Sequence, residues 1–233
     1  LRHICRLLKD KNIFMNDLND LKKIWTLIDR FEKSFGGLGG NVTYVLESVF
    51  LKAAANEAKK ELWEFVRGNA NDVRMPMPVG NCIGGGLHSM CAGHKVPDFQ
   101  EFLLIPHEKS FRRAITKNIR AYHFANILLN GRLSRKPKTN DESALITDKT
   151  NEEVLTILRK VADKYGLKIG LDVAASSFLD KNYYEYVNKR LTRDRLDQID
   201  YMERLVKKFK IFYLEDPMDE EDFGGFVEVL GSV

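Results

Sequence analysis

The chain has 233 residues, of which 44% are hydrophobic and 30% are charged, and its formal net charge is +4 at pH 7. This length allows one large domain or two small ones, and so weak a positive charge gives no reason to expect nucleic acid as a partner. No apolar run approaches the roughly 18 residues that span a bilayer, and no signal peptide precedes the first predicted helix, so we expect a cytoplasmic protein without a membrane partner.

Two amphipathic helices are predicted in the first part of the chain. Residues 16–31 place their apolar side chains, Trp25 among them, on one helical stripe. After a glycine-rich run, Asn41 is expected to cap a second helix that ends before Gly68. Trp63 also lies on an apolar stripe, and both tryptophans are expected in the core. The buried face of the second helix is expected to use Val42, Val45, Leu46, Val49, Phe50, Ala53 and Ala54.

From Met75 onward the sequence predicts strands and helices in alternation. Thr150 and Glu153 form a capping box for one of the helices, which ends before Gly166. In the later half this alternation favours parallel strands with helices outside. The predicted elements are a short strand that runs into a glycine turn within 75–86, strands at 99–106, 168–173 and 211–215, and helices at about 109–129, 150–165 and 192–208.

Two of the predicted strands end on a carboxylate, Asp172 and Glu215. Active sites gather at the C-terminal ends of parallel strands, and neighbouring strands lie about 4.8 Å apart. The two side chains could therefore share a small hard cation, and Mg²⁺ is favoured over zinc because the ligands are oxygens. The spacing alone leaves another interpretation open, in which each acid is a helix N-cap or a solvated loop residue.

Five segments of the chain resemble segments of one known family, in the same order and at plausible spacing. They are GGLGGNVTYVLESVFLKAAA (36–55), MPMPVGNCIGGGLH (75–88), DFQEFLLIP (98–106), GLDVAASSF (170–178) and FYLEDPMDEEDF (212–223). On these segments the sequence is identified as a member of the enolase (phosphopyruvate hydratase) family. The resemblance implies an α/β chain, with the helical remainder of an enolase N-terminal domain in 1–70. It also implies the first half of an enolase-type β/α (TIM-like) barrel in 71–233, opening with two strands and then two helices.

The resemblance also implies a function. Enolase is a lyase of glycolysis and gluconeogenesis that dehydrates 2-phospho-D-glycerate to phosphoenolpyruvate, and its Mg²⁺ stabilises an enediolate-like intermediate. By resemblance, Asp172 and Glu215 bind the metal, and Glu101 is a catalytic carboxyl group that handles the departing hydroxyl. Gln100 lies beside it in the substrate site, and His88 closes over the substrate near its phosphate.

A second catalytic carboxylate lies in a G-D-E-G-G loop in the family. Its counterpart here is Glu142 in NDESA (140–144), which keeps the acid but loses the flanking glycines. Because the backbone then has fewer conformations, displacement of Glu142 is left open. The sequence also departs from the family pattern at Gly84, where the family has Asn, and at Ser177, where it has Glu.

Some parts that the resemblance implies are missing from this sequence. A serine-bearing mobile loop would precede residue 1, and the third metal carboxylate and the base lysine would follow residue 233; residues 216–233 contain no lysine. We therefore expect a partial sequence that does not catalyse dehydration alone. The alternative is a non-catalytic enolase-like binding or scaffold protein, or a gene remnant. Enolases are commonly dimers, which leaves a homodimer open.

Cysteine and basic residues suggest two other sites. Cys82, His88, Cys91 and His94 are a conceivable zinc set, although their spacing fits no tight pattern. An odd number of cysteines without CxxC spacing indicates free thiols in a reducing compartment. The basic run in 130–143 has no interleaved aromatic residues, so we expect a solvated loop rather than a nucleic-acid site.

Overall fold

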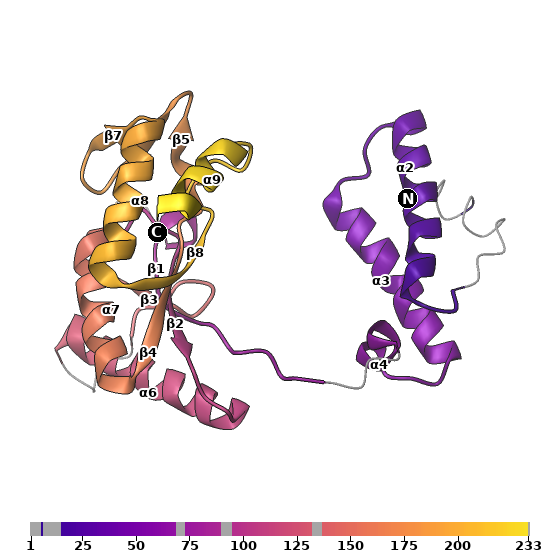
Figure 1. Cartoon of the computed structure of the whole chain (residues 1–233), viewed down its shortest axis with the longest axis horizontal. Coiled ribbons are helices and arrows are strands. Elements are labelled where there is room, and N and C mark those ends of the chain that lie inside the picture. The colour runs from indigo at the N-terminus through magenta and orange to yellow at the C-terminus, as the bar shows by residue number, and fades with distance from the viewer. Residues whose placement is uncertain (1–5, 7–14, 69–72, 90–94, 132–136, 233) are drawn as a thin grey trace. The chain divides into compact units, whose positions relative to one another are not determined.

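The structure is a computed structural model, in which the chain forms two compact units, Leu1–Arg74 and Met75–Val233 (Figure 1). Each unit has hydrophobic clusters of its own. The residues that the structure describes are 6, 15–68, 73–89, 95–131 and 137–232.

The smaller unit is helical. Its core contains Ile24, Ile28 and Phe31 from the first predicted stripe, together with Leu46. These residues confirm the helical period that the sequence indicates. The elements of the unit are the short 3-10 turn η1 (Leu18–Asp20) and the helices α2 (Leu21–Phe35), α3 (Gly40–Glu57) and α4 (Leu62–Arg67).

The second predicted helix is in fact two helices. Gly39, and not Asn41, occupies the N-cap position of α3. The helix stops at Glu57 because the chain then turns through Lys59, whose φ is +53°. Glu61 and Glu64 form a capping box that starts α4, so the prediction of one helix reaching Gly68 is wrong.

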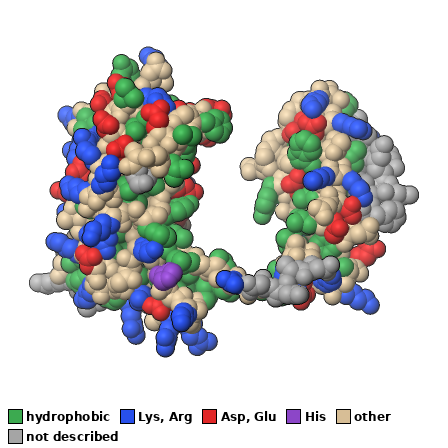
Figure 2. Space-filling model, in the orientation of Figure 1, with side chains coloured by type: hydrophobic (Ala, Val, Ile, Leu, Met, Phe, Trp, Pro, Cys, Tyr) green, Lys and Arg blue, Asp and Glu red, His purple; other side chains and the backbone are tan. Residues whose placement is uncertain are grey.

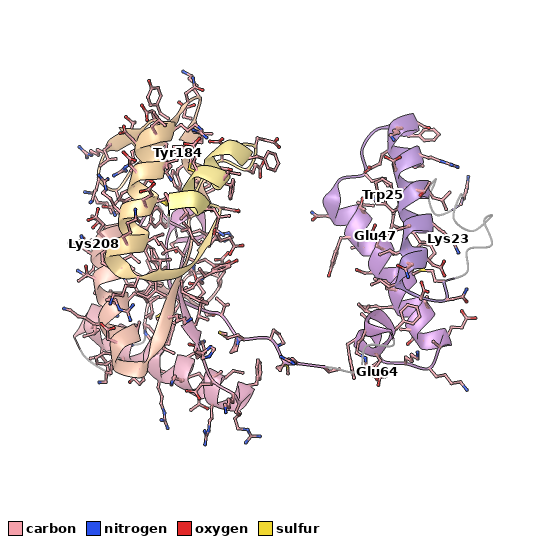
Figure 3. All side chains as sticks on the ribbon, in the orientation of Figure 1. Lys23, Trp25, Glu47, Glu64, Tyr184 and Lys208 are labelled. Carbon is pink, nitrogen blue, oxygen red and sulfur yellow. The ribbon has the colours of Figure 1, made fainter. Side chains whose placement is uncertain are left out.

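Several apolar side chains of this unit are exposed. Trp25, labelled on α2 in Figure 3, is 57% exposed, and Trp63 is 53% exposed. Val45 and Val49 on α3 are each 57% exposed. The prediction that these residues lie in the core is wrong, because the helices packed against them cover only part of each apolar stripe.

The larger unit is built on a five-stranded sheet with strand order β3-β1-β2-β4-β8. β2 runs antiparallel to both of its neighbours, whereas β4 and β8 are parallel, and so are β1 and β3. The α/β class is therefore confirmed, and the sheet is not closed into a barrel. The strands are β1 (Gly80–Gly84), β2 (Glu101–Pro106), β3 (Leu145–Ile146), β4 (Leu167–Asp172) and β8 (Ile211–Glu215).

Helices cover this sheet, and α7 and α8 run beside β4 in Figure 1. The core between them contains Leu155, Leu158 and Val161 of α7 and Ile169 and Leu171 of β4, all of them fully buried. The helices are α5 (Gly86–Ser89), α6 (Phe111–Asn130), α7 (Asn151–Tyr165), α8 (Arg195–Phe209) and α9 (Phe223–Ser232). Among the described helices, none has the length and apolar character needed to cross a bilayer.

The predicted ends of α7 are confirmed, and they place the strand that follows. Glu153 accepts a hydrogen bond from the backbone N–H of Thr150 at 2.8 Å and completes the capping box. Gly166 ends the helix with a φ of +60°, a conformation that glycine adopts without a steric penalty. β4 starts at the next residue, so Asp172 lies at its C-terminal end.

A small second sheet lies between β4 and α8 and was not predicted. It follows the 3-10 turn η2 (Ala175–Phe178) and buries Tyr184 and Tyr186. Its last strand occupies the start of the helix predicted at 192–208, and α8 begins only after Asp194, which caps it. The strands are β5 (Leu179–Asp180), β6 (Tyr183–Tyr186) and β7 (Leu191–Arg193).

β8 is an edge strand of the larger sheet, and in the described part of the chain β4 is its only partner. Two of its aromatic side chains, Phe212 and Tyr213, are 55% and 42% exposed. α9 adds exposed Val227 and Leu230 beside them. Figure 2 shows hydrophobic side chains along the corresponding border of this unit.

Candidate active site

Three carboxylates occupy one row across the larger sheet. Glu101 on β2 is the register partner of Asp172 on β4, and Asp172 is the register partner of Glu215 on β8. Register partners project from the same face of a sheet, with strands about 4.8 Å apart. This row contains three of the six residues that the sequence singles out, and a fourth, Gln100, donates a hydrogen bond to Asp172.

Asp172 is the most buried of the three, with 9% of its surface exposed. Its Oδ2 accepts a hydrogen bond from Gln100 Nε2 at 3.2 Å, and its Oδ1 accepts one from the backbone N–H of Ala174 at 3.0 Å. Burial and the charge of Glu215 raise the pKa of Asp172 to about 6. The hydrogen bond from Gln100 therefore orients the Asp172 carboxylate. Burial makes ionisation of this carboxylate less favourable than it is in water.

Glu215 is exposed and is held by its own strand. Its Oε2 accepts a hydrogen bond from the Tyr213 hydroxyl at 2.9 Å, and this bond raises the pKa of Tyr213. The sequence analysis missed Tyr213. Its position two residues before Glu215 was the available signal, because alternate residues of a strand share one face.

The pKa of Glu101 is raised far above the ordinary value of a glutamate. Burial raises its pKa most, the charges of Glu142, Asp172 and Glu215 raise it further, and His88 opposes them; the result is about 7. Both the protonated and the ionised form are then populated near neutral pH. Such a group can give or take a proton during a reaction.

Glu142 lies in the turn that precedes β3. Its Oε2 accepts a hydrogen bond from Asn81 Nδ2 at 3.2 Å, a contact that the sequence analysis did not foresee. Its effect on the pKa of Glu101 places its charge near the row. The next residue, Ser143, has a φ of +64° where the family pattern has glycine. The loop keeps its acid beside Glu101 although the glycines are absent.

His88 lies on the short helix α5 and is exposed. Its Nδ1 is 3.5 Å from Asp141 Oδ2, which is too long for a strong hydrogen bond. Ligand atoms of His88, Asp141 and Glu142 all lie within 4.8 Å of one another. All three residues are exposed, and exposed acidic groups of this kind are common without an ion.

The conceivable zinc set gains no support from the described residues. Cys82 is buried, and burial raises the pKa of its thiol to about 12, which disfavours the thiolate that binds zinc. Cys91 and His94 lie outside the described residues, as does Cys5. Arg132, Arg135 and Lys136 of the basic run in 130–143 also lie outside them.

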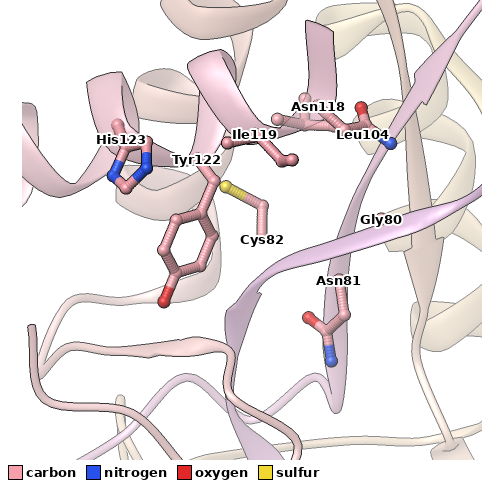
Figure 4. A pocket seen from close by; sticks show the side chains of 8 residues that line it. All are labelled: Gly80, Asn81, Cys82, Leu104, Asn118, Ile119, Tyr122 and His123. Carbon is pink, nitrogen blue, oxygen red and sulfur yellow. The ribbon is translucent and has the colours of Figure 1, made fainter. Parts of the chain in front are cut away.

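A pocket of about 330 Å³ lies between β1 and α6 (Figure 4). It is lined by Asn81, Cys82 and Tyr122 among others, and the Cys82 sulfur points toward α6. Two of its residues also hold the Glu142 loop, because Tyr122 donates a hydrogen bond to the carbonyl of Ser143 at 2.9 Å and Asn81 contacts Glu142. Two residues that line the pocket therefore also hold the loop that carries Glu142.

The residues present fit a hard divalent cation. Asp172 and Glu215 offer carboxylate oxygens from adjacent strand ends, the donor type that Mg²⁺ prefers. Their mutual repulsion contributes to the raised pKa of Asp172, and a cation between them would remove that cost. Ser177, which stands where the family has Glu, is exposed on η2.

Comparison with known proteins agrees with this geometry. The family model "Enolase, C-terminal TIM barrel domain" matches residues 72–233. Enolase of Methanosphaera stadtmanae is 35% identical over 91% of this chain and 53% of its own length, and enolase of Picrophilus torridus is 32% identical over 100% and 57%. Enolase of Methanothermobacter thermautotrophicus is 30% identical over 93% and 53%. The chain spans about half the length of these curated relatives, and over that span it belongs to the enolase family.

Proposed function

We propose that this chain supplies the metal-binding and leaving-group side of an enolase active site. The reaction is the dehydration of 2-phospho-D-glycerate to phosphoenolpyruvate in glycolysis and gluconeogenesis. The observation that carries the proposal is the row of Glu101, Asp172 and Glu215, with Glu142 near it. Residues 1–70 are then the helical part of the N-terminal domain, and 71–233 the first half of the barrel.

Asp172 and Glu215 are the residues that would hold Mg²⁺. When bound, a divalent cation supplies positive charge where negative charge develops on the substrate carboxylate. Gln100 keeps Asp172 oriented through its hydrogen bond, and the Tyr213 hydroxyl does the same for Glu215.

Glu101 acts on the departing hydroxyl of the substrate. With a pKa of about 7, a fraction of Glu101 is protonated at neutral pH and can pass its proton to the oxygen as the C3–O bond breaks, so that water leaves. Burial and, after it, the charge of Glu142 favour the protonated form of Glu101. His88 and Gln100 contribute to substrate binding. No residue of this chain is assigned to removing the proton from carbon 2.

The reaction is tested in the full-length protein that carries this sequence. Formation of phosphoenolpyruvate is followed by absorbance near 240 nm with Mg²⁺ present, for wild type and for Glu101→Gln. We expect Glu101→Gln to lower kcat by about 10²- to 10⁴-fold. Glu185→Gln, which removes an exposed acid from β6, should leave kcat unchanged. Equal kcat for wild type and Glu101→Gln would remove Glu101 from the mechanism.

The second candidate is a non-catalytic enolase-like protein that serves as a binding or scaffold protein in the cytoplasm. The changed residues Gly84, Ser143 and Ser177 favour it. Gly84 ends β1 as the register partner of Glu101, Ser143 follows Glu142, and Ser177 lies on η2, which follows β4. A folded full-length protein without magnesium-dependent turnover would support this candidate over the enzyme.

A further inference from the structure

The last residue of β1, Gly84, leaves a place in the row of side chains. It is the register partner of Glu101, so a side chain here would stand beside that carboxylate. A Cβ atom at Gly84 would lie 2.5 Å from Asn140 Nδ2 and 3.0 Å from Ser89 Oγ. Asn140 can occupy its observed position only because residue 84 has no side chain.

The side-chain amide of Asn140 makes three hydrogen bonds in that position. Its Oδ1 accepts hydrogen bonds from the backbone N–H groups of Glu142 at 3.1 Å and Ala144 at 2.9 Å. Its Nδ2 donates to Ser89 Oγ at 3.3 Å. An Asn side chain that binds its own following backbone in this way fixes a turn, and here the turn is the one that carries Glu142.

The turn needs such support because Ser143 adopts a left-handed conformation, with φ at +64°. The left-handed conformation is sterically unfavourable for a residue with a Cβ and is not for glycine. The hydrogen bond from Tyr122 to the Ser143 carbonyl adds a second restraint. The backbone conformation that glycines would permit is here imposed by contacts.

We propose that Asn140 is a positioning residue for Glu142 and that Gly84 is its matched partner, which provides the space that Asn140 fills. Glu142 is thereby held in contact with Asn81 and beside Glu101. The catalytic use of Glu142 rests on the proposed function; its position does not.

The resemblance to the enolase pattern agrees with a matched pair. The chain has Gly at 84 where the enolase pattern has Asn, and it has Asn at 140 where that pattern has the first Gly of G-D-E-G-G. The two departures are reciprocal, and the structure puts the two positions in contact. An exchange of this kind conserves the volume above the end of β1.

The test is a cycle of Asn140→Gly, Gly84→Asn and the double variant in the full-length protein that carries this sequence, without metal or substrate. The readout is the NMR signal of the Asn81 side-chain amide, which donates to Glu142 Oε2, with Glu142→Gln as the reference for loss of the carboxylate. We expect each single variant to move the signal at least halfway to its Glu142→Gln position. The double variant should restore it to within a quarter of that distance.

Two further variants serve as controls for a change of the Asn81 signal that is caused by unfolding. Asn140→Asp keeps the Oδ1 acceptor and should keep the Asn81 signal near its wild-type position. Gly231→Ala adds a Cβ in open space on α9 and should leave the signal unchanged. An unmoved signal in Asn140→Gly, or a double variant equal to the sum of the single ones, would overturn the pairing. Because no turnover is measured, either result leaves the dehydration proposal to its own test.

Discussion

Asp172 and Glu215 end two neighbouring parallel strands as register partners, so that two carboxylates leave the sheet side by side. If they share a cation, removing the charge of one should weaken binding. We expect Asp172→Asn to lower the affinity for Mn²⁺, used as a spectroscopic substitute for Mg²⁺, by at least about tenfold, or about 1.4 kcal/mol. Free Mn²⁺ measured by electron paramagnetic resonance during a titration gives the dissociation constant.

The control for this titration is Asp200→Asn, which removes the same charge from the exposed face of α8. It should leave the dissociation constant unchanged, because an exposed charge away from the site is screened by salt. Equal affinities for Asp172→Asn and Asp200→Asn would mean that the ion binds elsewhere, for example at the exposed group of His88, Asp141 and Glu142.

The raised pKa values of Glu101, about 7, and Asp172, about 6, make stability depend on pH. The unfolded chain releases both protons near pH 4, whereas the folded chain keeps them to higher pH. Between about pH 4 and 7 the folded state thus binds more protons, and its free energy of unfolding falls as pH rises. Urea unfolding from pH 4.5 to 8 should show this fall in the midpoint.

Glu101→Gln separates this effect from other titrations, because a neutral amide at position 101 removes one of the two carboxyl groups with a raised pKa. Its midpoint should fall less steeply between pH 5 and 7 than that of wild type. Added Mg²⁺ should raise the midpoint at pH 8 more than at pH 5, since protons compete with the cation for the same oxygens. If the urea midpoint depends on pH identically in wild type and Glu101→Gln, Glu101 does not have a raised pKa in the folded state.

Local rules predicted the elements that position Asp172. The capping box at Thr150, the stop at Gly166 and the apolar run that follows are all short-range signals, and they place Asp172 at the end of β4. The small sheet was missed although Tyr184 and Tyr186 alternate with exposed residues. Its strands are so short that the pattern scarcely exceeds one period.

The carboxylate pair followed from strand-end positions, but the rest of the site did not. Gln100, Glu101, Glu142 and His88 came only from the family resemblance. The contacts of Asn140 with Ser89 and of Asn81 with Glu142 join segments that are distant in sequence. No local pattern specifies such contacts, because they depend on how a loop packs against the end of a strand.

Thr150→Ala should destabilise the larger unit by about 1 kcal/mol, the usual cost of losing an N-cap side chain. Thr150 Oγ1 accepts from the N–H of Glu153, and α7 carries much of the buried core. Thr156→Ala is the matched control, since its hydroxyl binds only the carbonyl one turn back on the exposed side. Chemical denaturation compares the two; equal losses would show that the capping box contributes nothing specific.

The pKa of Glu101 should respond to its three acidic neighbours in a fixed order. Among the charges that raise it, Glu142 acts most strongly, then Asp172, then Glu215. In a carbon-13 NMR titration of the Glu101 carboxyl, Glu142→Gln should lower the midpoint most and Glu215→Gln least. Burial remains the largest cause, so no single variant should bring the pKa back to its ordinary value. Glu185→Gln on β6 should have no effect, and a larger fall for Glu215→Gln than for Glu142→Gln would show that Glu142 lies farther from Glu101 than the structure places it.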